Sequence, residues 1–392
     1  MPWKVTDLVE QRTQFVKEYL TQRYSMTELC RVYRISRQTG YECLQRFERE
    51  GWAGLQEHSH APYQHPNQTP APLEQRILQL RREYPRWGPR KLRGRLVEDY
   101  PNLPWPAAST MGELLHREGL ALPRKPRRRT PPYTQPFQAV SQPNDLWCAD
   151  FKGWFKTGDG ERIDPLTISD AHSRYLLRCQ AVDAGNREQV KGIYTAAFRE
   201  YGMPLAIRTD NGPPFASKAI AGLSQLSVWL LKLGLVPERI QAGHPEQNGR
   251  HERMHLTLKT ETAQPPAANR RAQQRRFDQF RHAYNEVRPH EALGQKTPSS
   301  QYQASPRIFP ERLPEPEYPG AMQVRRVRPG GNFKWQNHDV FLTRALDGEA
   351  IGLEPVDDRY WLVYYIRLPL ARFDSQELKI QALPKPPRPT ET

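Results

Sequence analysis

The amino-acid sequence predicts a multidomain protein with an all-α N-terminal region, a mixed α/β core and a small all-β C-terminal barrel. Through the N-terminal third, apolar residues recur at helical spacing. In the middle of the chain, short apolar runs suited to strands alternate with amphipathic helical stretches. After residue 318, short β-branched and aromatic runs are separated by glycine-containing turns. A chain of 392 residues is long enough for several such domains.

Residues 1–58 predict a helix-turn-helix domain. Val16 lies in a first helix, Thr27 caps a short second helix, and Ser36 caps a third helix in which Leu44 points inward. The recognition helix of such a domain lays its N-terminal polar residues against base edges. The candidate base-reading residues are Arg37, Gln38, Thr39 and Tyr41. A small helical bundle without a role in DNA binding is the alternative.

Residues 70–122 repeat this theme with looser spacing. Leu73 and Ile77 mark a helix, a Trp-Gly-Pro turn leads into the next, and Ser109 or Thr110 caps the last. This stretch is expected to form a second helical, helix-turn-helix-like DNA-binding domain.

The charge balance favours a polyanionic partner. Lys and Arg number 58 against 43 Asp and Glu, which gives a formal net charge of +15 at pH 7. Residues 123–142 are expected to form a stiff Pro-rich linker. Its basic cluster, a candidate phosphate contact, is Arg124, Lys125, Arg127, Arg128 and Arg129. The alternative is an ordinary charged surface that serves solubility alone.

The four cysteines, at positions 30, 43, 148 and 179, form no C-x-x-C pair. The sequence therefore supports neither a zinc site nor a disulfide framework, and it fits a reducing compartment. No run of about 18 apolar residues suggests a membrane span, and no N-terminal signal is present. A soluble, cytosolic protein without a membrane partner is expected.

Residues 143–305 predict the α/β core. The expected elements are strands at 147–151, 166–169 and 175–181, a helix from Asn186 to Gly202, a strand at 205–209 and a helix from Ser217. This order of elements is that of a ribonuclease-H-like mixed sheet.

Three acidic residues occupy the ends of these elements. Asp150 and Asp210 each close a strand-like run, and Glu252 opens a helix-like run. If they converge, two charges about 4 Å apart repel by about 4 kcal/mol at an effective dielectric near 20. Such a cluster suits two Mg²⁺ ions that clamp a phosphate. Asp170 and Asp183 also lie near strand ends, where turn formation is the expected role.

Residues 318–376 predict the C-terminal barrel, and residues 377–392 a disordered tail. Strand-like runs at 324–327, 340–342 and 360–366 are separated by turns at Gly330-Gly331 and Asp347-Gly348. A structural cap without a role in DNA binding is the alternative to a DNA-binding barrel.

Several motifs of the core resemble those of bacterial insertion-sequence DDE transposases of the retroviral-integrase type. They are Trp-x-x-Asp-Phe-Lys-Gly at 147–153, Thr-Asp-Asn-Gly at 209–212, His-Pro-Glu-Gln-Asn-Gly-Arg-His-Glu-Arg at 244–253, and Tyr-Asn-Glu, Arg-Pro-His and Leu-Gly-x-x-Thr-Pro between 284 and 298. The resemblance is strongest over about 140–300 and extends more loosely to both ends of the chain.

The resemblance implies that Asp150, Asp210 and Glu252 form a catalytic, metal-binding DDE triad that holds two Mg²⁺ ions, for which Mn²⁺ may substitute. Glu246 competes for the third position, because 35 residues separate it from Asp210, a spacing familiar in this superfamily, whereas 41 separate Glu252 from Asp210. Glu252 is preferred because it follows the Gly of the motif and begins a helix. The resemblance also implies that Lys259, two helical turns after Glu252, approaches bound DNA.

The implied function is a transposase that binds the terminal inverted repeats of its element, cleaves the DNA ends by metal-assisted hydrolysis and joins the 3′-OH ends to target DNA. The expected partners are double-stranded DNA, both element ends and target, and further copies of the chain in a homodimer or higher oligomer on that DNA. A bacterial, nucleoid-associated location in the cytoplasm follows. The alternatives are a transposase-derived sequence-specific regulator without catalysis and a ribonuclease-H-like nuclease without strand transfer.

Overall fold

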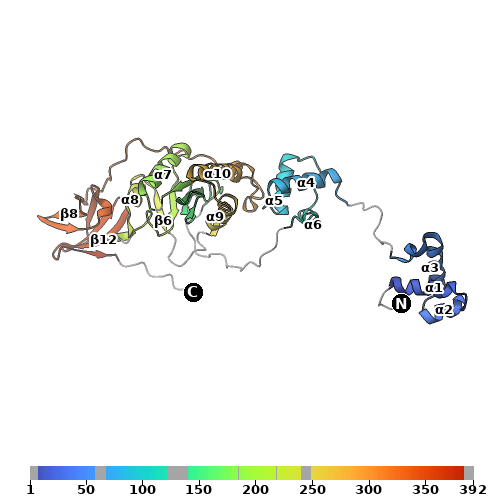
Figure 1. Ribbon diagram of the computed structural model, residues 1–392. Helices are drawn as coiled ribbons and strands as arrows, with labels where there is room; N and C mark the ends of the chain where they lie inside the picture. Colours follow the sequence, from blue (N-terminus) through green and yellow to red (C-terminus); the bar gives the residue numbers. More distant parts are fainter. Residues whose placement is uncertain are drawn as a thin grey trace. The chain divides into compact units, whose positions relative to one another are not determined.

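The computed structural model describes residues 8–57, 68–121, 140–183, 185–217, 219–239 and 249–383 (Figure 1). The chain divides into two compact units, Met1–Pro70 and Ala71–Thr392. The expected basic cluster at 124–129 and the competing Glu246 lie outside the described residues.

The first unit contains helices α1 (Leu8–Leu20), α2 (Met26–Tyr33) and α3 (Arg37–Glu50), followed by a 3₁₀ turn at Gly51–Leu55. Its core contains Phe15, Val16, Leu29, Leu44 and Leu55, all buried.

Hydrogen bonds to serine side chains cap the N-termini of α2 and α3. The Ser36 hydroxyl accepts a hydrogen bond from the Thr39 amide at 3.1 Å, so the expected cap of α3 is confirmed. The expected cap of α2 at Thr27 is wrong. Ser25 caps α2 instead, in a reciprocal box in which the Glu28 carboxylate accepts from the Ser25 amide at 2.8 Å.

The second unit opens with α4 (Ala71–Glu83), α5 (Pro89–Asp99) and α6 (Ala108–Arg117), which pack around a core that includes Trp87 and Leu92. The cap expected at Ser109 or Thr110 is also wrong, because α6 begins after Ala107 without a side-chain cap. Buried Arg81 donates hydrogen bonds to the carbonyls of Trp87 and Leu120, at 2.6 and 2.7 Å, and so ties α4 to the chain that follows α6.

The centre of the second unit is a six-stranded mixed sheet. Its strands are β1 (Leu146–Phe151), β2 (Phe155–Lys156), β3 (Arg162–Asp170), β4 (Leu176–Val182), β5 (Ala206–Thr209) and β6 (Val236–Arg239). β1 pairs antiparallel with β3 and parallel with β5, which pairs parallel with β6. This is the expected ribonuclease-H-like arrangement, with two strands, β2 and β6, that the sequence did not suggest.

Helices cover both faces of this sheet. α7 (Arg187–Tyr201) and α8 (Gln225–Lys232) share a core with Trp147, Leu166 and Ile168 on one face. α9 (Gly249–Thr262) and α10 (Arg270–His282) share another with Leu176 and Cys179 on the opposite face. The helix expected from Ser217 begins later, because Ser224 is the N-cap of α8.

Side chains close the edge strand β4. The Asn285 side chain accepts a hydrogen bond from the Leu176 amide at 2.8 Å and donates one to the Leu176 carbonyl at 3.0 Å. Gln274 of α10 pairs in the same way with the Ala181 amide and the Cys179 carbonyl, each at 2.9 Å. These amides occupy strand groups that would otherwise be available to another chain.

The C-terminal region is all β. Its strands are β7 (Gln323–Arg326), β8 (Asn332–Trp335), β9 (His338–Phe341), β10 (Ala350–Pro355), β11 (Tyr360–Tyr365), β12 (Leu368–Asp374) and β13 (Lys379–Ala382). A five-stranded antiparallel sheet and the β8–β9 hairpin share one core, which also takes in Leu223 and Val228. β13 pairs with β12, so the expectation of a disordered tail from residue 377 is wrong for this stretch.

Shorter helical turns complete the described chain. They lie at Ile220–Gly222, Ala283–Val287 (a π turn), Glu291–Leu293, Ser299–Gln301 and Arg344–Leu346. No helix in the described ranges is both long enough and apolar enough to cross a membrane.

Candidate active site

Asp150 lies in β1, and Asp210 directly follows β5, the parallel neighbour of β1. The register of β1 and β5 ends at the pair Cys148 and Arg208, and each aspartate follows two residues later. Because side chains alternate between the two faces of a sheet, Asp150 lies on the face that α9 covers, and an extended backbone after Thr209 would direct Asp210 to the same face. Trp147 and Ala149, at the alternate positions of β1, lie in the core on the α7 side.

The two carboxylates are partly removed from solvent. The Asp150 side chain is 18% exposed. Burial raises the pKa of Asp210, and a hydrogen bond from the Gly212 amide, at 3.2 Å, partly opposes this change. A β-carbon at position 212 would lie 3.0 Å from an Asp210 carboxylate oxygen, so glycine at the end of the Thr-Asp-Asn-Gly motif leaves room for this carboxylate. A carboxylate that is poorly hydrated gains from a bound cation.

Helix α9 is held against the same face of the sheet through its buried side. Met254, His255 and Leu258 are at most 6% exposed. The His255 Nδ1 atom lies 3.9 Å from an Asp150 carboxylate oxygen. Glu252 is one turn earlier on α9, and its side chain is exposed, as is that of Lys259 two turns later. α9 therefore brings Glu252 to the Asp150 end of the sheet while leaving its carboxylate accessible.

A chain of hydrogen bonds anchors α9 behind Asp150. Thr167, directly opposite Asp150 on β3, is fully buried. Its hydroxyl lies 2.7 Å from Nε2 of both His251 and His255, and Nδ1 of His251 lies 3.4 Å from the Ser169 hydroxyl.

The direction of this chain follows from the single proton of the Thr167 hydroxyl, which donates to the Asp150 carbonyl at 3.2 Å. The same oxygen then accepts from the Nε2–H groups of His251 and His255, and Nδ1 of His251 accepts from the Ser169 hydroxyl. We assign this direction, in which Thr167 ties both histidines of α9 to the backbone of β1 at Asp150.

Burial keeps both imidazoles neutral. It lowers the pKa of His251 to about 4. It lowers the pKa of His255 to about 2, with smaller contributions from the charges of His251 and Lys152. A neutral imidazole with one N–H and one lone pair is what the directed chain requires.

The three carboxylates have the chemistry of a magnesium or manganese site, since hard divalent cations prefer carboxylate oxygens. Asp150 and Asp210 come from the ends of neighbouring parallel strands. In the described part of the chain, however, no three His, Cys, Asp or Glu side chains are close enough together to hold a metal ion. Asp150, Asp210 and Glu252 therefore do not form a preformed cluster.

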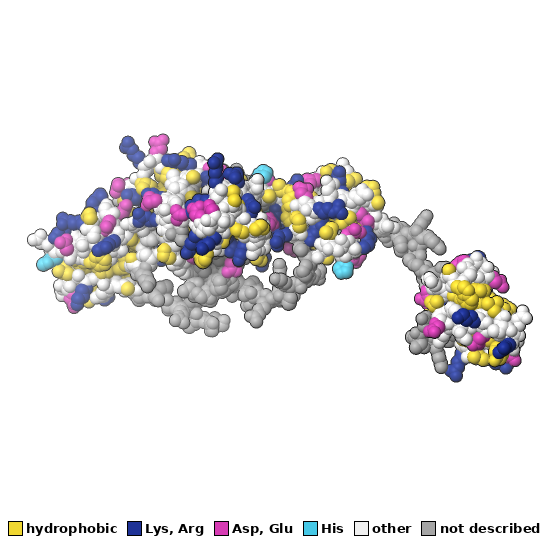
Figure 2. Space-filling model, in the orientation of Figure 1, with side chains coloured by type: hydrophobic (Ala, Val, Ile, Leu, Met, Phe, Trp, Pro, Cys, Tyr) yellow, Lys and Arg dark blue, Asp and Glu magenta, His cyan; other side chains and the backbone are white. Residues whose placement is uncertain are grey.

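The expected base-reading residues lie together in the other unit. Arg37, Gln38 and Tyr41 are exposed on the first turns of α3, and Thr39 is half-buried. Thr39 is partly engaged in the helix cap, because its hydroxyl lies 2.8 Å from that of Ser36. Across the face shown in Figure 2, Lys and Arg side chains are spread over both units and interspersed with acidic ones.

Sequence reasoning missed Thr167 and gave His251 and His255 no specific contact. The one available signal was the spacing of the two histidines, four residues apart on a predicted helix, which places both on one face. A threonine inside a strand carries no comparable signal.

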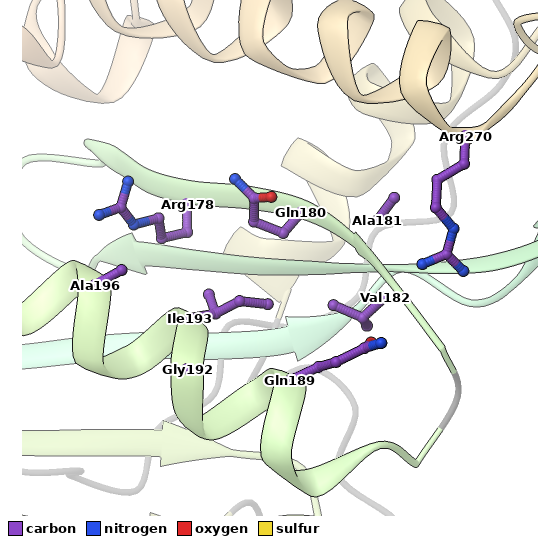
Figure 3. A pocket seen from close by; sticks show the side chains of 9 residues that line it. All are labelled: Arg178, Gln180, Ala181, Val182, Gln189, Gly192, Ile193, Ala196 and Arg270. Atoms are coloured by element: carbon purple, nitrogen blue, oxygen red, sulfur yellow. The ribbon is translucent and has the colours of Figure 1, made fainter.

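The hollow in Figure 3, of about 390 Å³, lies between β4, α7 and the start of α10. Its two arginines already have acidic partners. Arg178 pairs with Glu200 at 2.6 Å, and Arg270 pairs with Glu161 at 2.7 Å and with Asp183. These pairs neutralise the charge that would attract a phosphate, and none of the three candidate catalytic residues lines the hollow.

Sequence-family models agree with this architecture. Models of the integrase core domain match residues 140–245 and 233–298. A homeodomain-like domain model matches residues 39–115, and a helix-turn-helix domain model matches residues 11–63.

Several curated relatives are proteins of bacterial insertion elements. The chain is 30% identical to the insertion element IS407 protein of Burkholderia multivorans over 62% of its own length and 83% of that protein. It is 29% identical to the IS476 protein of Xanthomonas euvesicatoria, over 67% and 73% respectively, and 28% identical to transposase InsD of IS2 from Escherichia coli, over 57% and 75%.

Among solved structures, the HTLV-2 integrase catalytic core in complex with magnesium aligns at 16% identity with a TM-score of 0.32, over 41% of this chain and 97% of that one. With a score this low, family membership rests on the sequence matches. The integrase core, the helix-turn-helix domains and the insertion-element relatives together show that the chain belongs to the insertion-sequence transposases of the retroviral-integrase-like superfamily.

Proposed function

We propose that the protein is an active DDE transposase. It binds the terminal inverted repeats of its insertion sequence, cleaves the DNA at the element ends and joins the resulting 3′-OH ends to target DNA. Two ends have to be held together for this reaction, so the active form is a dimer or a larger assembly on DNA.

One observation carries this proposal. Asp150 and Asp210 come from the ends of neighbouring parallel strands, and Thr167 holds the helix that carries Glu252 against the strand of Asp150. Family membership implies polynucleotidyl transfer, and this arrangement supplies the residues for it. We infer that binding of DNA completes the site by bringing the exposed Glu252 carboxylate to the metal ions.

In the proposed reaction each residue has a distinct role. Asp150, Asp210 and Glu252 hold the divalent ions. These ions, when bound, supply a hydroxide nucleophile and charge stabilisation for the phosphodiester. His251 and His255 hold α9 against Thr167, whose hydroxyl also bonds the backbone of Asp150, and Lys259 contacts the DNA backbone. Arg37 and its neighbours on α3 read bases of the repeat, and the barrel and the basic linker bind phosphates, so binding weakens as salt rises.

A strand-transfer assay with labelled element ends tests the proposal. The end sequences come from inverted repeats in the DNA that flanks the gene. Joined products that require Mg²⁺ or Mn²⁺ are expected. Cleavage without joining would replace the proposal with a nuclease, and binding without cleavage would replace it with a regulator.

A further inference from the structure

A second hollow, of about 370 Å³, opens beside the candidate active site. It lies between the chain that follows Asp150 and the second half of α9. Its lining is mixed, with the apolar residues Phe155, Pro165, Leu258 and Phe277 beside polar ones such as Thr262 and Gln264. Lys152, Trp154 and Lys259 also line it, and we call it the Trp154 hollow. Its volume lies within the range of pockets that take small ligands.

Trp154 takes no part in core packing. Its side chain is 55% exposed, and it belongs to none of the hydrophobic cores of the described chain. The Arg162 guanidinium lies over the ring, 4.6 Å from its centroid. An exposed aromatic surface beside cationic groups is the usual platform for an unpaired base, which stacks on the ring while the cations hold its phosphates.

The two lysines of the hollow are available to an anion. Neither Lys152 nor Lys259 lies within 4.0 Å of a carboxylate in the part of the chain that the structure describes. Burial and the nearby charge of Lys259 lower the pKa of Lys152, while Asp150 and Asp164 act in the opposite direction. A phosphate between the two ammonium groups would relieve their repulsion. In the hollow of Figure 3, by contrast, the two arginines are already paired with carboxylates.

We propose that the Trp154 hollow receives an unstacked nucleotide of the DNA end, next to the phosphodiester that is cut. The base stacks on Trp154 beside the apolar residues of the lining, and its phosphates lie between Lys152 and Lys259. This inference rests on the proposed function and deepens it: the enzyme would recognise an opened end as well as a sequence. Freeing one base at a duplex end is less costly than in the interior, because fewer stacking contacts are lost.

The test compares the affinity of the full-length protein for two duplexes of one sequence in EDTA, so that no cleavage occurs. One is fully paired, and the other has two mismatched terminal nucleotides that include 2-aminopurine. The wild type is expected to prefer the open end by about tenfold, the effect of stacking one base, and to quench the 2-aminopurine fluorescence.

Trp154→Ala is expected to remove both the preference and the quenching while affinity for the paired duplex is retained. Trp154→Phe should keep most of the preference. Lys152→Ala should weaken binding of the open end, whereas Lys156→Ala, on β2 but outside the hollow, should not. No preference in the wild type, or an undiminished preference in Trp154→Ala, would overturn the inference. Failure to bind either duplex would instead contradict the proposed function.

Discussion

Replacing Thr167 with valine removes the centre of the hydrogen-bond chain that links β3, α9 and Asp150. The substitution keeps the β-branched shape of a fully buried side chain and exchanges its hydroxyl for a methyl group, so the main change is the loss of a polar group. It deletes one hydroxyl that lies 2.7 Å from Nε2 of both His251 and His255. The perturbation is therefore confined to polar contacts.

The expected loss of stability follows from those contacts. Two buried imidazole nitrogens lose their partner, and each such group costs about 1–3 kcal/mol. The free energy of unfolding of the core should fall by about 2–6 kcal/mol in total. For a core of this size, at about 2–4 °C per kcal/mol, that corresponds to a melting temperature lower by about 4–24 °C. Metal-dependent cleavage should fall further than binding of the DNA ends, because α9 and Asp150 lose their common anchor.

Thermal unfolding and cleavage of a labelled element end measure the two effects. Thr167→Ser is the matched control, since it keeps the hydroxyl and loses one methyl group, at a cost of about 1 kcal/mol. Wild-type stability and cleavage in Thr167→Val, or equal losses in the valine and serine variants, would refute the view that these hydrogen bonds position α9.

Three further predictions concern the carboxylates, the base-reading helix and pH. The conservative carboxylate variants should abolish cleavage and leave end binding intact; they are Asp150→Asn, Asp210→Asn and Glu252→Gln. Activity that survives in Glu252→Gln but is lost in Glu246→Gln would assign the third ligand to Glu246. Arg37→Ala should reduce discrimination between element ends and random duplex more than it reduces total affinity, and Arg49→Ala, in the last turn of α3, should not change discrimination. Because burial lowers the pKa of His251 and His255 in the folded protein, the unfolded chain takes up protons first as pH falls below about 6.5. The free energy of unfolding, measured by urea titration, should then decrease from about pH 6.5 toward pH 4. The decrease should be smaller in the double variant His251→Gln, His255→Gln. An equal decrease in the variant and the wild type would contradict the assignment of neutral imidazoles.

Local signals in the sequence determined the domain classes and most helix and strand positions. The apolar spacing of α3 and the capping serine at position 36 involve residues only a few positions apart. Both can therefore be recognised in the sequence without knowing which distant segments pack against the helix. The same holds for the apolar runs that end at Asp150 and Asp210. Local patterns also placed Glu252 in the first turn of a helix, as observed.

Other features depended on residues far apart in the chain. β6, Val236–Arg239, has no apolar alternation and exists because it pairs with β5. Ser224, rather than Ser217, begins α8, because the helix starts where Leu226 and Trp229 reach the core.

The sequence by itself determined which residues are the candidates for the chemistry, since motif, strand end and helix start are all local properties. Only the tertiary structure decided how they are held. Thr167 meets the two histidines across more than eighty residues of chain. Glu252 stays exposed on α9. Trp154 borders a hollow whose lining comes from its own segment and from β3, α9 and α10. The physical reason is that burial, hydrogen-bond direction and the shape of a hollow arise from packing between distant segments, which no short stretch of sequence encodes.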